Sequence, residues 1–258
     1  MGARPIALLN SLRFGPLNEE RNRYLFNGVV SGISWYGNCI GIPNVGGEIQ
    51  FSSSYNNNPL VNAMCVGLVE KKRMRRSTLG EAGNILLLVG ADTGRDGIHG
   101  ASGLASRTFE EEREMRSAVQ VGNPFLKKLL IEACLEASNI ESLVGIQDLG
   151  AAGLTSATVE AAHSGGNGIL VDLARVHQRE ENMDPYDILL SESQERMLLA
   201  VKNDGVQKIK AIFDRWEIPC IAIGKVTSDL TARIVKNAEN IAEVPVEILT
   251  EAPTYHIQ

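Results

Sequence analysis

The sequence lacks several features that would place it in a special class of protein. No apolar run approaches the roughly 18 residues that a membrane span needs, and no signal-peptide pattern opens the chain. The four cysteines form no C-x-x-C pair and lie mostly in apolar runs, which predicts buried, reduced thiols. The formal net charge of −6 argues against binding to nucleic acid or anionic lipid. Together these absences predict a cytoplasmic protein without a membrane or nucleic-acid partner.

The composition is that of a protein with a folded core. The 258 residues are 44% hydrophobic and 22% charged, which excludes disorder and allows one large domain or two ordinary ones. Glycine is in excess, with 25 residues where average usage would give roughly 18. Much of the excess lies in tight clusters, so we expect turns or close ligand approach at particular places.

The chain changes character near residues 71–82. A basic run, Lys71 to Arg76, is most simply a solvated turn or interdomain crossover, because no aromatic residues interleave with it for base stacking. The pattern before it predicts strands at 6–10, 48–52 and 63–70 and a glycine-punctuated helix at 24–40.

After this boundary, strands and helices alternate, which predicts an α/β domain with a mixed sheet. The apolar run Ile85–Val89 is typical of a buried strand, and Asn123 and Pro124 have the N-cap and first-turn residue types of a helix. Further strands are expected at 143–147, 168–172, 196–201 and 219–226, helices at 151–163 and around 206–216, and a weak hairpin at 232–235 and 241–246.

The densest glycine cluster, Gly90 to Gly103, directly follows the strand Ile85–Val89. Its backbone N–H groups could face an anion, with Thr93 and Arg95 assisting a phosphate. The segment lacks the Gly-Lys-Ser/Thr ending of a P-loop and the spacing of a dinucleotide fingerprint. A ligand loop and a structural crossover therefore fit equally well.

Two polar segments flank other predicted strands. Asp148 ends one strand and precedes a glycine-rich helix start, where α/β sheets hold a metal ion and the phosphate it serves; the alternative is a helix-capping residue. Ser191 to Glu195 precedes another strand and fits recognition of a polar substrate; the alternative is a solvated turn. Gln120 has no feature of its own that separates it from a surface residue.

A G-x-C-x-G segment at Gly37–Gly41 has the form of a nucleophile elbow around Cys39. A nucleophilic cysteine needs an activating histidine, usually oriented by a carboxylate. The four histidines of the chain offer no His-x-Glu pair, which disfavours this role for Cys39.

Six segments, in order along the chain, share their motifs with one family. They are residues 1–7, 44–48, 94–100, 119–125, 147–154 and 191–196. Together they resemble the ATP-binding large subunit of phosphoribosylformylglycinamidine synthase (PurL), in the PurM/PurL superfamily. The resemblance implies an α/β (α+β) chain with three parts. Residues 1–75 would be part of an N-terminal-type, ATP-binding domain, 76–248 a C-terminal-type substrate- and metal-binding domain with a mixed sheet, and 249–258 a linker toward a second half.

The resemblance also implies a reaction. The family is an ATP-dependent carbon–nitrogen ligase that converts formylglycinamide ribonucleotide, ATP and ammonia to formylglycinamidine ribonucleotide in purine biosynthesis. Matched by motif, Gln120, Glu192, Ser193 and Gln194 would bind substrate and Asp148 would bind Mg²⁺, with ATP as a substrate. The implied partners are a glutaminase subunit and a small bridging subunit.

The family's catalytic histidines match positions upstream of Met1, so we assign no catalytic residue here and expect this chain to be a fragment that is inactive alone. Its incomplete first domain should expose apolar sheet edges and favour self-association. The alternatives are a non-catalytic nucleotide- or substrate-binding module and another ATP-dependent kinase or synthetase of the superfamily. The segment Ser191–Arg196 favours the ligase.

Overall fold

The computed structural model describes residues 1–98 and 119–251, and the chain forms two compact units. We call Gly2–Arg73 the N-terminal unit and Met74–Gln258 the C-terminal unit; Met1 groups with the latter. Within the described ranges, no helix is both long and apolar enough to cross a membrane.

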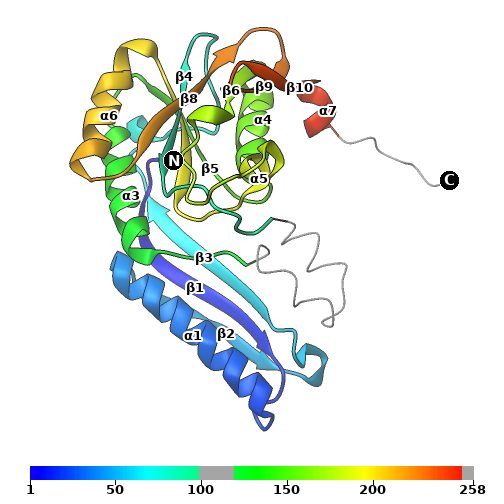
Figure 1. Ribbon diagram of the computed structural model, residues 1–258. Coiled ribbons are helices and arrows are strands. Elements are labelled where there is room, and N and C mark those ends of the chain that lie inside the picture. Colours follow the sequence, from blue (N-terminus) through cyan, green and yellow to red (C-terminus); the bar gives the residue numbers. More distant parts are fainter. Residues whose placement is uncertain (99–118, 252–258) are drawn as a thin grey trace, which may run out of the picture. The chain divides into compact units, whose positions relative to one another are not determined.

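A three-stranded sheet with one long helix forms the N-terminal unit (Figure 1). The central strand, β1 (Arg4–Phe14), pairs in parallel with β2 (Asn44–Phe51) and antiparallel with β3 (Leu60–Leu68). Helix α1 (Glu20–Ile40) connects β1 to β2. The predicted helix and strands of this part of the chain are therefore confirmed.

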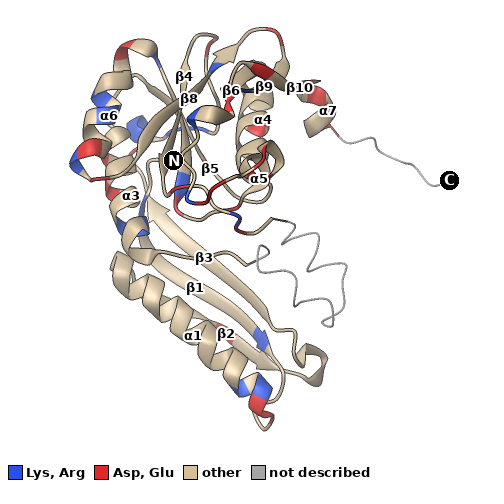
Figure 2. Cartoon of the chain, viewed as in Figure 1, with Lys and Arg blue, Asp and Glu red and all other residues tan. Residues whose placement is uncertain are grey.

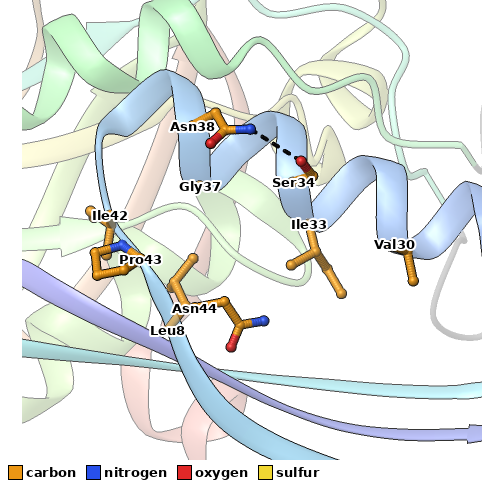
Figure 3. A pocket seen from close by; sticks show the side chains of 9 residues that line it. All are labelled: Leu8, Val30, Ile33, Ser34, Gly37, Asn38, Ile42, Pro43 and Asn44. Atoms are coloured by element: carbon orange, nitrogen blue, oxygen red, sulfur yellow. Dashed lines mark hydrogen bonds between the residues drawn. The ribbon is translucent and has the colours of Figure 1, made fainter.

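Helix α1 packs against this sheet through aromatic and aliphatic side chains. Phe26 of α1 meets Phe14 edge to face, with ring centroids 5.1 Å apart, and lies 6.1 Å from Phe51. The charged residues of α1 are confined to its first turn, and Figure 2 shows the rest of the helix without charge. A pocket of about 270 Å³ lies between the end of α1 and the sheet (Figure 3). Its lining is Leu8, Val30, Ile33, Ser34, Gly37, Asn38, Ile42, Pro43 and Asn44.

The two outer strands of this sheet are uncovered. Every residue of β2 and β3 is exposed. The expectation of buried thiols is accordingly wrong for Cys65, which lies exposed on β3. The large apolar side chains exposed on these strands are Val45, Ile49, Phe51, Leu60, Val61, Met64, Val66 and Leu68.

The C-terminal unit contains a seven-stranded mixed sheet in the order β10-β9-β6-β8-β4-β7-β5. All of its neighbouring pairs are antiparallel except β6 and β9, which are parallel. The strands are β4 (Ile85–Gly90), β5 (Leu143–Asp148), β6 (Gly168–Asp172), β7 (Arg196–Val201), β8 (Cys220–Thr227), β9 (Thr231–Lys236) and β10 (Glu239–Pro245). The helices are α3 (Pro124–Ala137), α4 (Gly153–Gly165), α5 (Pro185–Leu190), α6 (Val206–Arg215) and α7 (Val246–Thr250). Short 3-10 turns are η1 (Ser53–Tyr55) and η2 (Lys71–Arg73) in the N-terminal unit and η5 (Leu173–Arg175) and η6 (Asn203–Gly205) here.

Helices cover both faces of this sheet (Figure 1). Leu86 and Leu88 of β4 enter a core shared with α4 and α5, whereas Leu87 and Val89 enter a second core shared with α3 and α6. Because the side chains of a strand alternate between faces, a strand buried on both faces is apolar at every position. This explains the continuous apolar run at 85–89.

The element predictions in the C-terminal unit hold with small exceptions. The Asn123 side chain caps α3, accepting a hydrogen bond from Leu126 N at 3.1 Å. Helix α5 was not predicted, although Asp184 and Asp187 form a capping box at its start. The predicted strand at 241–246 ends at Pro245, since Val246 begins α7. Most of the predicted linker, residues 252–258, lies outside the described residues.

Candidate functional site

Three sequence motifs leave the C-terminal unit's sheet at one edge. Strand β7 lies between β4 and β5 and runs antiparallel to both. Its first residue, Arg196, pairs with Gly90 at the end of β4, and Met197 pairs with Asp148 at the end of β5. The segments that follow β4 and β5 and the segment before β7 therefore emerge together. We call this region, with the start of α3, the motif edge. It comprises residues 90–97, 119–123, 148–153 and 191–196.

The segment before β7 is buried and tied to the glycine segment after β4. The hydroxyl of Ser191 donates to the Gly94 carbonyl oxygen at 2.6 Å. The hydroxyl of Ser193 accepts from Gly94 N at 2.9 Å and donates to the Asp96 carboxylate. Glu195 has a left-handed backbone conformation, with φ of 58°. The alternative of a solvated turn is therefore wrong for this segment.

Glu192 links all four segments of the motif edge. Its carboxylate accepts hydrogen bonds from Gln120 Nε2 at 2.7 Å and from Ala152 N at 3.1 Å, and its own N–H donates to the Asp96 carbonyl at 2.7 Å. Gly97 has a φ of 66°, and a Cβ there would lie 2.6 Å from Glu192 Cβ. Glycine is thus required for the close approach of these two segments.

The two glutamines of the predicted substrate site are its more accessible members. Gln120 is exposed and Gln194 is half-buried, whereas Glu192 and Ser193 are buried. The Gln194 side chain donates to the Glu192 carbonyl oxygen at 3.0 Å. Because an amide side chain both donates and accepts, the glutamines suit contact with a polar ligand. The structure thus brings the four predicted residues together. Two of them, Glu192 and Ser193, are buried beneath the more accessible Gln120 and Gln194.

Asp148 is exposed at the end of β5. It does not cap α4, because the N-cap residue is Ala152, which makes no side-chain cap. The helix start instead packs against the segment before β7. Gly153 has a φ of 52°, and a Cβ there would lie 1.9 Å from the Ser191 carbonyl oxygen. The helix-capping alternative is therefore wrong for Asp148.

The chemistry of Asp148 fits one ligand of a magnesium ion. Carboxylate oxygens are the protein ligands that Mg²⁺ prefers, and the ion often uses one or two of them together with water and substrate phosphates. In the ranges that the structure describes, no three His, Cys, Asp or Glu side chains form a group that could hold a metal ion. To hold Mg²⁺, Asp148 would need further ligands, such as water and the phosphate oxygens of a bound substrate.

The first part of the glycine cluster has a structural role. Thr93 is fully buried, and Arg95 pairs with Glu180 at 3.1 Å and with Asp187 at 2.8 Å. The hydrogen bond to the Glu180 side chain, followed by that to Asp187, raises the pKa of Arg95. The expectation that Thr93 and Arg95 assist in binding a phosphate is therefore not supported, because both side chains are engaged within the protein. The rest of the cluster, residues 99–103, lies outside the described residues.

Three buried charged residues of the motif edge, Asp96, Glu195 and Arg196, received no individual role from the sequence. Asp96 accepts two hydrogen bonds from Arg179 Nη2, at 2.8 and 2.9 Å, which raises the pKa of Arg179. Burial lowers the pKa of Arg196 to about 10, and the nearby Asp96 charge opposes that shift. The Glu195 carboxylate accepts from Asn123 N at 3.1 Å. The usable signal was Arg196 itself, a charged residue beginning an otherwise apolar strand.

Three of the four cysteines lack the surroundings of a catalytic nucleophile. Cys39 lies in the last turn of α1, whereas a nucleophile elbow is a turn between a strand and a helix. No histidine occurs in the sequence of the N-terminal unit. Burial raises the pKa of the Cys134 and Cys220 thiols to about 12, which leaves them protonated and unreactive at neutral pH.

Comparisons with known proteins match both parts of the chain. The family described as AIR synthase related protein, C-terminal domain, matches residues 81–236, and the corresponding N-terminal domain family matches residues 1–69. The chain is 56% identical over 256 residues to phosphoribosylformylglycinamidine synthase subunit PurL of Thermomicrobium roseum and 54% identical to that of Moorella thermoacetica. Each alignment covers 99% of this chain and 35% of the relative, so the chain spans about a third of these relatives' length.

Solved structures give the same result. Thermotoga maritima PurL complexed with FGAR superimposes with a TM-score of 0.90 and 39% identity over 100% of this chain and 41% of that chain. The complex of the same protein with ATP gives a TM-score of 0.85 and 36% identity, covering 100% and 40%. The structure of PurLQS from Thermotoga maritima gives 0.86 and 36%, with coverage of 100% and 40%.

Proposed function

The chain belongs to the family of AIR synthase related proteins, and from this premise we propose that its motif edge binds formylglycinamide ribonucleotide for ATP-dependent amidation. In this reaction, ATP phosphorylates the amide oxygen of the substrate and so creates a leaving group. Ammonia then attacks the carbon that carries this phosphorylated oxygen, and phosphate leaves. Phosphoryl transfer of this kind depends mainly on orientation and charge neutralisation, which are what a rigid polar site supplies.

The observation that carries this proposal is the position of Glu192. Its hydrogen bonds to Gln120, Ala152 and the Asp96 carbonyl join the four motif segments to one another. Motifs that are far apart in the sequence but joined by side-chain hydrogen bonds are expected when they serve one ligand. The relative whose structure carries FGAR shares this fold, which supports the same substrate for this chain.

We assign the substrate contacts to four residues, Gln120, Glu192, Ser193 and Gln194. The accessible glutamine amides would meet the polar groups of the ribonucleotide directly. The buried Glu192 and Ser193 already use their side chains to hold neighbouring segments, so their own contacts with the substrate would come through the backbone. This division makes the glutamines the sharper targets for testing.

Asp148 is our proposed ligand for Mg²⁺. When bound, Mg²⁺ offsets the negative charge of the ATP phosphates. The exposure of Asp148 beside the N-terminus of α4 leaves its carboxylate accessible to a cation. ATP is the proposed second substrate, since a relative with 36% identity was solved with ATP.

The whole protein's partners follow from the same premise. A structure of PurLQS exists for Thermotoga maritima, and we propose that the protein to which this chain corresponds acts with a glutaminase subunit and a small bridging subunit. The glutaminase would supply ammonia. We propose the cytoplasm as the compartment, because ATP and the reduced thiols of the sequence belong there.

Calorimetric titration of formylglycinamide ribonucleotide into the 258-residue chain tests the substrate site. We expect Gln194→Ala to weaken binding about tenfold, the scale of one or two lost hydrogen bonds. The matched control is Gln207→Ala, an exposed glutamine on α6, which should bind like the wild type. Equal affinities for the wild type and Gln194→Ala would reject the assigned role of Gln194.

A further inference from the structure

Arg196 is a buried guanidinium whose hydrogen bonds go to uncharged acceptors. It is 2% exposed and opens strand β7. Its Nε donates to the Ser193 carbonyl at 2.9 Å, its Nη2 to the Ser191 carbonyl at 2.6 Å, and its Nη1 to the Thr93 hydroxyl at 2.9 Å. The three nitrogens thus reach three acceptors on two segments of the motif edge.

A cation in this position is costly to bury. Removing a charge from water is unfavourable unless hydrogen bonds and nearby charges compensate, and burial here lowers the pKa of the guanidinium. The other residues of β7, Met197 to Val201, are all apolar. An apolar residue would serve a purely packing role at the start of such a strand equally well. The guanidinium therefore has a task that depends on its hydrogen bonds.

The two carbonyls that Arg196 binds belong to particular peptide groups. The Ser191 carbonyl lies in the peptide that carries the Glu192 N–H, and the Ser193 carbonyl lies in the peptide that carries the Gln194 N–H. Because a peptide group is planar, holding its carbonyl also sets the direction of its N–H. Arg196 thus sets the direction of the backbone at both Glu192 and Gln194.

The third bond connects this segment to the glycine segment. Thr93 is fully buried, and its backbone is held by His177 and Arg179, whose carbonyl and N–H bond to it at 2.9 and 2.8 Å. The hydroxyl of Thr93 is therefore a fixed acceptor for Arg196. This arrangement braces the start of β7 against the chain that follows β4.

We propose that Arg196 is a positioning residue of the substrate site, whose planar guanidinium orients Glu192 and Gln194 for binding formylglycinamide ribonucleotide. This inference rests on the proposed function. The proposed role requires more than a positive charge at position 196, because only the forked guanidinium of arginine reaches all three acceptors. A lysine in the same place keeps the charge but presents a single point donor.

The first test compares substrate affinity in Arg196→Lys with that of the wild-type chain by calorimetry. We expect binding to weaken about tenfold or more while the far-ultraviolet circular dichroism spectrum is unchanged. Arg215→Lys, on the exposed end of α6, is the matched control and should bind like the wild type. If the wild type does not bind, the proposed function and this inference both fall. Equal affinities for the wild type and Arg196→Lys would overturn this inference alone.

A second pair of variants covers the case in which Arg196→Lys does not fold. Thr93→Val removes the hydroxyl acceptor at nearly constant volume, whereas Thr93→Ser keeps it. We expect Thr93→Val to weaken substrate binding and Thr93→Ser to restore most of the affinity. Equal affinities of the two Thr93 variants would contradict a role for the hydrogen bond from Arg196 to the Thr93 hydroxyl in substrate binding.

Hydrogen exchange separates positioning from general destabilisation. In Arg196→Lys, the amides of Glu192 and Gln194 should exchange about tenfold faster, because the carbonyls of their peptide groups have lost the guanidinium donors that hold them. Amides in the centre of β7, such as that of Leu199, should keep their wild-type rates. A uniform acceleration across β7 would mean that Arg196 contributes only to overall stability, and would overturn the proposal.

Discussion

The two units of the chain differ in how far their apolar strands are buried. In the C-terminal unit, β4 and β7 are covered by helices on both faces, and their apolar residues are buried in two cores. In the N-terminal unit, the strands β2 and β3 are exposed at every position although they also contain large apolar side chains. An apolar run therefore indicates a strand in both units, but the run is buried on both faces only in β4 and β7 of the C-terminal unit.

The difference has a consequence for where the binding site can form. A site needs residues held rigidly by packed neighbours, and the motif edge is attached to strands whose side chains are buried on both faces. The exposed strands of the N-terminal unit offer instead an apolar surface suited to association. The C-terminal unit thus holds the candidate site, and the N-terminal unit holds the candidate contact surface.

The largest expected contrast is between matched leucine truncations. Leu199→Ala in β7 should lower the free energy of unfolding of the C-terminal unit by about 2–5 kcal/mol, because Leu199 is fully buried. Leu68→Ala in β3 should change the stability of the N-terminal unit by less than about 0.5 kcal/mol, because Leu68 is 66% exposed.

The two tryptophans let urea denaturation report each unit separately. Trp35 lies in the N-terminal unit and Trp216 in the C-terminal unit. Fluorescence of Trp216 is followed in a Trp35→Phe background, and fluorescence of Trp35 in a Trp216→Phe background. Similar losses for Leu199→Ala and Leu68→Ala would show that the two units do not differ as described.

A smaller effect is expected for association through β3. Met64 is 61% exposed on this strand, and Met64→Lys should weaken self-association of the chain about tenfold by placing a charge in the apolar surface. Sedimentation equilibrium over a range of concentrations measures this. Asn203→Lys adds the same charge on the C-terminal unit and should leave association unchanged. Equal effects of both variants would point to net charge instead of the β3 surface.

The smallest expected effect concerns pH and the contacts of Arg95. Hydrogen bonds from the Arg95 backbone N–H and then from its side chain lower the pKa of Glu180. The carboxylate therefore stabilises the fold above its ordinary pKa, and that contribution is lost as the pH falls through the lowered value. At neutral pH, Glu180→Gln should be less stable by under about 1 kcal/mol, since the pair is partly exposed.

Thermal unfolding at neutral and strongly acidic pH checks this prediction. The stability gap between the wild type and Glu180→Gln should be present at neutral pH and close in acid. Glu160→Gln, an exposed residue on α4, serves as the control and should show no such gap. A difference in stability between the wild type and Glu180→Gln that grows in acid would contradict a lowered pKa for Glu180.

Much of the fold could be predicted from local sequence patterns. Strand β4 was visible as a continuous apolar run, and the start of α3 was visible in Asn123 and Pro124. These signals are local, because they come from the period of a strand and the capping of a helix. Exposure of the apolar strands β2 and β3 was expected only from the resemblance, which implies an incomplete first domain, and not from a local pattern, because burial depends on what packs against a strand.

The candidate site was only partly predictable for a similar reason. Family motifs pointed to Gln120, Asp148 and Ser191–Arg196, but not to how they meet. The antiparallel placement of β7 between β4 and β5 brings them together, and strand order is not a local property. The burial of Thr93 and the pairing of Arg95 with Glu180 and Asp187 likewise depend on segments about 90 residues away in the sequence.

The central claim is that the motif edge binds formylglycinamide ribonucleotide. Nuclear magnetic resonance of the isotope-labelled chain, titrated with this compound, tests it most directly because each backbone amide reports separately. We predict saturable shifts concentrated in residues 119–123, 148–153 and 191–196, with little change in the strands of the N-terminal unit. Saturable shifts confined to the N-terminal unit, or none in these three segments, would contradict the claim.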